Sequence, residues 1–268
     1  MGQVSLHVEL LAHTPQPENT IAMGAKLCYS ASSIDTLREK IAAKDQQAFL
    51  QKLMDMGHLS PVEHSSFTFG VEGVSRALLA QATRHRLASF SVQSQRYVNQ
   101  AAEGGFSYIV PPAIEALGEE SLGEYRRQME QMSLWYQEWV QKLGNAGEKS
   151  NEDARFVLPN AAETKFVVTM NARELQHFFG VRCCSRAQWE IRALAWAMLG
   201  HCLAAAPSLF GHSGPGCVGG PCPEGQKSCG RAKEMRALAG ELAAYAQAHG
   251  KEKDYAAQLT GWVREHTI

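Results

Sequence analysis

The residues best suited to chemistry gather in one segment of the chain. It begins with Arg84-His85-Arg86 and ends with Ser94-Gln95-Arg96-Tyr97, so three Arg, one His and three Ser fall within fourteen residues. Guanidinium and hydroxyl groups are good donors to phosphate oxygens. The amides of Gln93 and Gln95 can both donate to and accept from the edge of a pyrimidine or a flavin. The segment therefore indicates a pocket for a phosphorylated, nucleotide-like ligand.

A solvated basic turn is the simplest alternative for this segment. Two features argue against it. The segment follows a stretch, residues 77–82, whose apolar residues predict a buried helix, and it contains neither Lys nor Glu. A solvated helix face normally carries charged residues of both signs. We therefore expect the Arg side chains to emerge from a core toward a ligand.

The elements that must position this segment are mostly helices. Alternating and β-branched stretches predict strands at residues 4–11, 66–71, 106–110 and 164–170. Helical periodicity and end signals predict helices at residues 21–29, 35–56, 75–85, 119–143, 151–157, 171–179, 187–206, 231–248 and 251–265. No internal repeat and no linker composition separates them.

Particular residues set the expected ends and faces of these elements. Asn171 is a predicted N-cap, and Gly73 is expected to end the strand at 66–71. The helix at 119–143 is amphipathic, and we expect Leu134, Trp135 and Trp139 in its apolar stripe.

Bulk composition excludes several classes of protein. The chain has 268 residues, 45% of them hydrophobic and 20% charged, which is typical of a globular protein. Its formal net charge of −1 gives no broad basic surface, so we expect no nucleic-acid partner. The sequence has no run long enough to span a membrane and no signal peptide at its start. We expect a cytoplasmic protein without a membrane partner.

A Gly- and Pro-rich loop carries three of the seven Cys residues. His212, Cys217, Cys222 and Cys229 are separated by four, four and six residues. Three thiolates and an imidazole are a possible zinc ligand set, although the C-x2-C spacing typical of zinc sites is absent. A disulfide and simple free thiols are the alternatives, and all three remain open.

The motif at the start of the basic segment resembles a family signature. Arg84-His85-Arg86, followed by seven residues and Ser94, matches the signature of the flavin-dependent thymidylate synthases. The resemblance covers roughly residues 5–210. It includes TPQPE (14–18), AKLCY (25–29), HLSPVEH (58–64), FTF (67–69), ARFVLP (154–159), NAR (171–173), and Arg182 followed by AQWEI (187–191).

The resemblance implies an activity and an architecture. Members of the family methylate dUMP to dTMP, with methylenetetrahydrofolate as the carbon donor and NADPH-reduced FAD as the hydride source. They are homotetramers with shared active sites. Their α+β fold has a mixed sheet with antiparallel strands flanked by helices, which suits the few strands and many helices expected here. We expect a catalytic domain at residues 1–210, with the Cys-bearing loop and the C-terminal helices at 211–268 packed on the same domain.

The resemblance also assigns residues to ligands. The implied dUMP contacts are Gln81, Arg84, Ser94, Gln95, Arg96, Arg155 and Arg182. The implied FAD contacts are Ser60, Arg84, His85, Arg86, Asn171, Arg173 and His177, with His58 near the flavin and the folate. An Arg at the pyrimidine edge can stabilise negative charge that develops on uracil. Arg182 matches that position, and no protein nucleophile is expected.

One departure and one alternative qualify these expectations. Val92 stands where many family members carry Glu or Gln, which leaves that contact open or transfers it to Gln93. The alternative function is a nucleotide- or RNA-binding module that clamps phosphate without turnover. Such a module needs a wider basic surface with interleaved aromatic residues, which the balanced charge disfavours.

Overall fold

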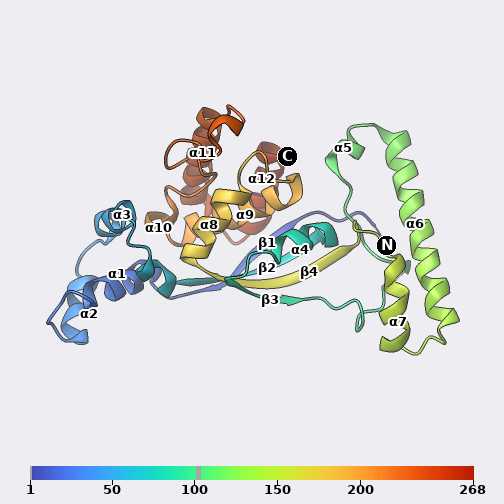
Figure 1. Ribbon diagram of the computed structural model, residues 1–268, viewed down its shortest axis with the longest axis horizontal. Helices are drawn as coiled ribbons and strands as arrows, with labels where there is room; N and C mark the ends of the chain where they lie inside the picture. Colours follow the sequence, from blue (N-terminus) through green and yellow to red (C-terminus); the bar gives the residue numbers. More distant parts are fainter. Residues whose placement is uncertain (1, 101–103) are drawn as a thin grey trace. The chain divides into compact units, whose positions relative to one another are not determined.

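The computed structural model describes residues 2–100 and 104–268 (Figure 1). The chain forms two compact units. Unit 1 comprises Met1–His7, Val71–Arg84 and Phe90–Val167, and unit 2 comprises Val8–Gly70, His85–Ser89 and Val168–Ile268. Because each unit is assembled from three stretches of chain, residues far apart in the sequence meet within one unit.

The strands form one four-stranded sheet in the order β1-β2-β4-β3. They are β1 (His7–His13), β2 (Ser66–Ser75), β3 (Ala88–Val92) and β4 (Glu163–Asn171). The Oγ1 atoms of Thr68 and Thr169 lie 2.9 Å apart, whereas Glu72, later in β2, pairs with Lys165, earlier in β4. This register makes β2 and β4 antiparallel and confirms the α+β class.

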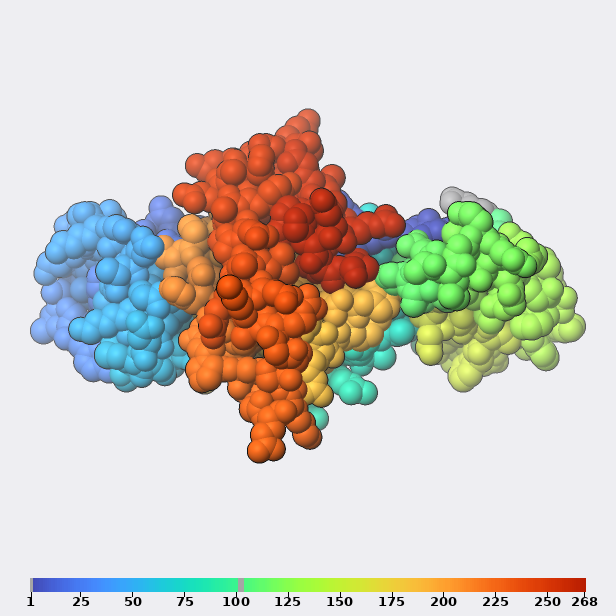
Figure 2. Space-filling view, turned by 90° about the horizontal axis from the view of Figure 1, so that it is seen from above, coloured from blue at the N-terminus to red at the C-terminus, as the bar shows by residue number. Residues whose placement is uncertain are grey.

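Unit 2 contains a helical core around α9 (Trp189–Ala205). Every α9 residue from Glu190 to Leu203 except Arg192 is buried, as expected of a helix that is apolar on all sides. The helices that pack on it are α8 (Ala172–Arg182), α10 (Pro207–Phe210), α11 (Ala232–His249) and α12 (Tyr255–Thr267). Figure 2 shows the orange-to-red C-terminal segment on the surface of this unit.

The N-terminal part of unit 2 adds three helices and a 3-10 turn. These are α1 (Pro17–Leu27), α2 (Ile34–Ala42), α3 (Gln47–Asp55) and η1 (Ser60–His64). The η1 turn packs against both α1 and α8. It therefore carries the residues around Ser60 to the side of α8.

Unit 1 is organised along the long helix α6 (Glu119–Lys142), which Figure 1 shows beside α7 (Glu148–Ala154). Its other helical elements are α4 (Arg76–Ala82), α5 (Pro112–Glu115) and η3 (Arg155–Val157). Leu122 and Met129 pack in one cluster with Phe106 and Tyr108. Tyr136, Val140 and Ala154 form a second cluster, which joins α6 to α7.

Several predicted elements are confirmed. The alternating segment at 164–170 is β4, and Asn171 caps α8 by accepting a hydrogen bond from the Glu174 backbone N–H. The helices expected at 119–143, 231–248 and 251–265 are α6, α11 and α12. The sequences of these elements show a clear helical or strand periodicity or a good N-cap residue. Both features depend only on residues that are close in the sequence.

The single helix predicted at 35–56 is wrong, because two helices occupy that stretch. Ser33 caps the first helix, α2, and residues 43–46 separate it from α3. The buried Gln46 side chain donates to the carbonyl oxygens of Ile41 and Lys44, and the Asp45 carboxylate accepts from the Gln47 N–H. Side-chain bonds to the backbone thus replace the helical bonds at the break.

The strand predictions need three corrections. β2 does not end before Gly73 but runs through it to Ser75. Residues 106–110 form no named strand, and Tyr108 makes isolated bridges to Gln3 and Ala162. β3 was not expected, because its residues lie within the basic segment, which was interpreted by its ligand-binding side chains and assigned to no strand.

The predicted apolar stripe of α6 is also wrong. Leu134, Trp135 and Trp139 are 52%, 47% and 46% exposed. The buried face instead carries Leu122, Met129, Ser133, Tyr136 and Val140. Along its second half the helix carries large apolar residues on two faces. The Trp side chains therefore pointed to the exposed face rather than to the buried one.

Candidate active site

A chain of three polar side chains in unit 2 forms the centre of the candidate site. His85 lies just beyond the end of α4, and Glu174 and Arg182 lie on α8, eight residues apart. This spacing is close to two helical turns, so both side chains share one face. The His85 ring packs edge-on against Phe178 of the same helix, with ring centroids 4.9 Å apart. α8 thus holds His85 between a carboxylate and a guanidinium.

The hydrogen bonds define the protonation of His85. Arg182 Nε lies 3.0 Å from His85 Nε2, and His85 Nδ1 lies 3.2 Å from Glu174 Oε1. A guanidinium can only donate, so Nε2 must accept and Nδ1 must carry the proton that Glu174 accepts. This arrangement requires a neutral imidazole.

The surroundings of His85 favour the same neutral form. Burial lowers the pKa of His85, and the charges of Arg182 and His177 lower it further. The hydrogen bond and the charge of Glu174 raise the pKa but do not reverse the shift. His85 and Glu174 are 8% and 7% exposed, so little water reaches the pair.

The other expected flavin residues in unit 2 lie on or at the start of α8, in or just before η1, and next to His85 in the sequence. Asn171 uses its side-chain oxygen to cap α8, and Arg173 forms an ion pair with Glu63 of η1. Ser60 begins η1. The residues of this set that are exposed are His58, Ser60, Arg86, Arg173 and His177. Unit 2 therefore gathers exposed donors at η1 and α8 near the buried His85.

Most of the expected dUMP residues belong to unit 1. Gln81 lies near the end of α4, and Arg84 follows it and is exposed. Arg96 forms ion pairs with two carboxylates of α7, those of Glu148 and Glu152, the second at 3.1 Å from Nε. The Arg96 guanidinium is thus already matched by negative charge.

The segment from Ser94 to Arg96 is a turn held from α7. Ser94 Oγ accepts from the Arg96 N–H at 3.2 Å, and Asn151 Nδ2 donates to the Arg96 carbonyl oxygen at 3.0 Å. The Tyr136 hydroxyl donates to Asn151 Oδ1 at 3.2 Å. The position of Ser94 is therefore fixed by a polar network that reaches the core of unit 1.

Sequence comparison identifies the family. Residues 9–208 match the family described as "Thymidylate synthase complementing protein". A Geobacter sulfurreducens protein named flavin-dependent thymidylate synthase is 52% identical over 238 residues, which are 88% of this chain and 99% of that protein. The chain belongs to the flavin-dependent thymidylate synthase family. A Clostridium tetani protein of the same name is 47% identical over 246 residues, covering 88% of this chain and 97% of that protein.

A solved structure shares the fold of this flavin-dependent thymidylate synthase family member. It is the UMP/dUMP methylase PolB of Streptomyces cacaoi bound with 5-Br dUMP, with a TM-score of 0.63 and 24% identity. The match covers 78% of this chain and 95% of that chain. Family membership makes the chain an enzyme of the methyltransferase class, so the binding module without turnover is set aside.

Arg76 is a residue that the sequence did not single out. It is the first residue of α4, and its Nη1 lies 3.4 Å from Thr164 Oγ1. Burial lowers the pKa of Arg76, and the positive charge of Arg155 lowers it further. Two guanidinium groups that repel each other within unit 1 favour an anion beside them. The only sequence signal was an Arg at the start of an otherwise apolar helix.

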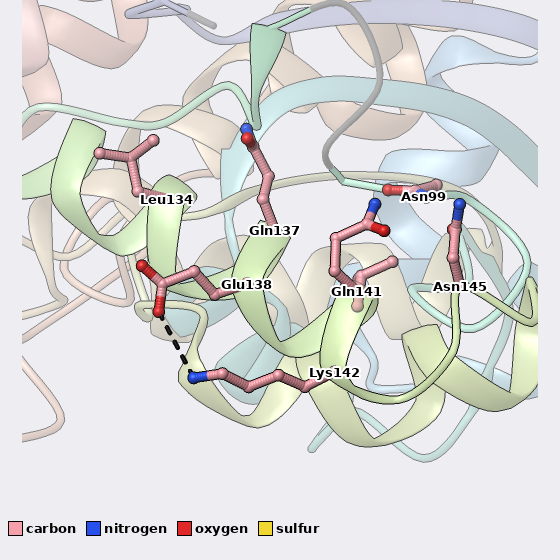
Figure 3. Close-up of a pocket in the computed structure, with 8 residues that line it drawn as sticks. Asn99, Leu134, Gln137, Glu138, Gln141, Lys142 and Asn145 are labelled. Atoms are coloured by element: carbon pink, nitrogen blue, oxygen red, sulfur yellow. Dashed lines mark ion pairs between the residues drawn. The ribbon is translucent and has the colours of Figure 1, made fainter.

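A surface hollow of about 730 Å3 lies along α6, apart from these residues (Figure 3). It is lined by Asn99, Leu134, Gln137, Glu138, Val140, Gln141, Lys142 and Asn145. Glu138 and Lys142 form an ion pair in it, at 3.7 Å. None of the residues expected to bind dUMP or flavin lines this hollow, so its size alone does not mark the active site.

Neither a membrane-spanning helix nor a preformed metal site is found among the residues that the structure describes, 2–100 and 104–268. No helix among them is both long enough and apolar enough to cross a membrane. No three His, Cys, Asp or Glu side chains among them are already arranged to hold a metal ion.

Proposed function

We propose that this enzyme methylates dUMP to dTMP, with methylenetetrahydrofolate as the carbon donor and NADPH as the source of reducing equivalents through FAD. The observation that carries the proposal is the hydrogen-bonded chain from Glu174 through His85 to Arg182. It lies in a member of the flavin-dependent thymidylate synthase family and contains two of the residues that match the family's ligand-binding positions.

Arg182 is proposed to activate the uracil ring. Its guanidinium stabilises the negative charge that develops at N3 and O2 when the ring acts as a nucleophile through C5. The bond from Nε to His85 uses one of five N–H groups and fixes the plane of the fork. A neutral His85 accepts this bond without repelling the guanidinium, whereas a protonated His85 could not accept it and would repel the guanidinium. His85 is thus a positioning residue for Arg182.

The dUMP phosphate is proposed to bind Ser94, Arg84 and Arg155, with Gln81 and Gln95 at the pyrimidine. Arg155 donates from Nε to the Glu152 carbonyl oxygen, which orients its guanidinium. Arg96 has two carboxylate partners, so a phosphate would have to compete with them. We therefore propose that Arg96 mainly fixes the turn that presents Ser94.

The polar groups around α8 suit a flavin nucleotide. Arg86 and Arg173 offer guanidinium donors to its phosphates, and Ser60, Asn171 and His177 offer further hydrogen-bonding groups. Arg84 is proposed as an additional flavin contact on the resemblance to the family alone. Both ring nitrogens of His85 are already hydrogen-bonded, so any flavin contact of His85 would be through its ring. Bound FAD supplies the hydride that completes the methyl group. His58 is proposed to lie near the flavin and the folate.

We also propose a homotetramer whose catalytic domain is residues 1–210. The half-exposed apolar residues of α6, among them Trp135 and Trp139, support the assembly, because isolated chains seldom expose such a patch. The packing of α11 and α12 on α9 supports the view that residues 211–268 extend the same domain.

Product formation in a defined mixture tests the proposed activity. Purified enzyme is incubated with dUMP, methylenetetrahydrofolate, NADPH and FAD, and dTMP is quantified by chromatography. We expect a yellow protein and dTMP in the complete mixture. No dTMP should form when dUMP, methylenetetrahydrofolate or NADPH is left out, or when stripped enzyme receives no FAD. Equal dTMP formation without NADPH, or without flavin on stripped enzyme, would refute the proposed reaction.

A further inference from the structure

Four thiols from two separate stretches of unit 2 line one cavity. Cys184 lies in the connection between α8 and α9, and Cys217, Cys222 and Cys229 lie in the segment between α10 and α11. The cavity has a volume of about 410 Å3 and all four residues line it. All four are free thiols, with Cys217 buried and Cys229 exposed. The fold therefore adds Cys184 to the three thiols that the linear spacing had already grouped.

We propose that this cavity is a zinc site whose ligands are the thiolates of Cys184, Cys217, Cys222 and Cys229. Zinc in structural sites is tetrahedral, and four Cys ligands are a common set. Thiolates select soft or borderline cations over magnesium and calcium. The sequence had suggested His212 as the fourth ligand, but His212 does not line the cavity, whereas Cys184 does. This site goes beyond the proposed reaction and does not depend on it.

Hydrogen bonds hold the cysteine-bearing segment in place. Arg186, just before α9, donates to Glu224 Oε2 at 3.1 Å and to the Lys227 carbonyl oxygen at 2.8 Å. Arg236 of α11 donates to the carbonyl oxygens of Cys217 and Gly220 at 2.8 and 2.7 Å. The segment is thus anchored at four positions between Cys217 and Cys229, and all four thiols line the same cavity.

The charges around the cavity suit a tetrathiolate centre. On binding, each thiol would release its proton to solvent and form a bond to the metal, so that one Zn2+ and four thiolates would carry two negative charges. Arg182 and Arg186 also line the cavity and would offset that charge. The Ser185 hydroxyl already donates to Cys229 Sγ at 3.2 Å and would support that ligand.

To coordinate one ion, the four thiols must come closer together, which requires movement of the segment between α10 and α11. The thiols share a cavity but are not yet arranged as a coordination sphere within the described part of the chain. Gly219 and Gly220 lie between Cys217 and Cys222, and a Cβ at Gly220 would meet nothing within 4 Å. The segment also lies on the surface, as the orange region of Figure 2 shows. We infer that the backbone at Gly219 and Gly220 can adjust to bring the thiols around an ion.

Metal content of the full-length protein tests the site. The protein is produced in zinc-supplemented cells, purified without chelators under reducing conditions, and measured by elemental mass spectrometry. We expect about one zinc per chain, since a structural site closed by four thiolates binds tightly. The single variants Cys184→Ser, Cys217→Ser, Cys222→Ser and Cys229→Ser should each lose most of it. Cys28→Ser is the matched control and should keep it, because Cys28 is exposed on another element.

A second measurement keeps the test decisive if a variant fails to fold. Wild-type protein stripped of metal is titrated with Co2+, which should give the visible bands of a tetrahedral thiolate site, and Zn2+ should remove them. A thiol reagent applied to the native, metal-loaded protein should then no longer modify the four cavity thiols. Less than about a tenth of an equivalent of zinc, together with no cobalt bands, would overturn the proposal. An intact mass showing a disulfide among these thiols in the reduced preparation would also overturn it.

Discussion

At the scale of single residues, the most informative feature is the direction of the hydrogen bonds around His85. Because Arg182 can only donate, His85 must accept at Nε2, and a proton on that nitrogen would break the bond. The neutral state is therefore part of the proposed site. It makes the position of Arg182 sensitive to pH through a residue that does not itself contact uracil.

This coupling predicts an acid limb in the activity profile. The pKa of His85 in the folded protein lies below its ordinary value of 6.5, so His85 is neutral at neutral pH and activity should fall as the pH drops below that value. Glu174→Gln removes an interaction that raises the pKa of His85, so the acid limb should move to lower pH. The pH dependence of kcat for dTMP formation measures the shift.

A matched control separates this effect from a general loss of stability. Glu39 lies exposed on α2, and Glu39→Gln should leave the acid limb in place. An acid limb that stays at the wild-type pH in Glu174→Gln would show that His85 does not control Arg182.

Residue-scale contacts were only partly accessible from the sequence. The motif Arg84-His85-Arg86 marked the region, and the match to the family pointed to Arg182. The contact between His85 and Glu174 joins residues 89 positions apart, and no local pattern encodes such a contact. The same limit hid Cys184, whose partners in the cavity lie more than thirty positions further along the chain.

At the scale of elements, local chemistry explains which predictions succeeded. Asn171 caps α8 by accepting a backbone N–H, as expected from its residue type, and Ser75 caps α4 in the same way although it was not singled out as a cap. The break between α2 and α3 was missed because it depends on bonds from the Gln46 side chain. The wrong face of α6 was chosen because periodicity does not show which of two apolar faces meets the core.

Gly73 gives an element-scale prediction about stability. Its φ is +66°, and a Cβ there would lie 1.9 Å from the Ser5 carbonyl oxygen, within unit 1. Gly73→Ala should therefore destabilise the protein by more than the roughly 1–3 kcal/mol typical of backbone strain alone. Chemical denaturation of the purified variants measures the free energy of unfolding.

Gly118 provides the comparison for this substitution. It has a φ of +93°, but a Cβ there would meet nothing within 4 Å. Gly118→Ala should cost only the backbone strain, about 1–3 kcal/mol. Equal losses for the two variants would show that the close approach of Ser5 to β2 is not rigid.

At the scale of the whole molecule, α6 presents the clearest candidate for an interface between copies. Trp135 and Trp139 lie half exposed on it, and Trp residues often dominate the binding energy of interfaces. Trp135→Lys should raise the dissociation constant of the assembly by about tenfold or more. Analytical ultracentrifugation over a range of concentrations measures this change.

The exposed Gln128, earlier on α6, supplies the control for that experiment. Gln128→Lys adds the same charge on the same helix and should leave the assembly unchanged. A wild-type protein that sediments as a monomer at every concentration would rule out the proposed tetramer, and an unaffected Trp135→Lys assembly would place the interface elsewhere.

The central claim is that Arg182 activates uracil, and Arg182→Ala tests it most directly. The measurement is the single-turnover rate of dTMP formation, made on enzyme whose FAD content is read from its visible absorption. Arg38→Ala, an exposed Arg paired with Asp35, is the control. We expect the Arg182 variant to retain FAD while the rate falls by about two orders of magnitude or more. A rate close to that of the wild type, with FAD bound, would contradict the account.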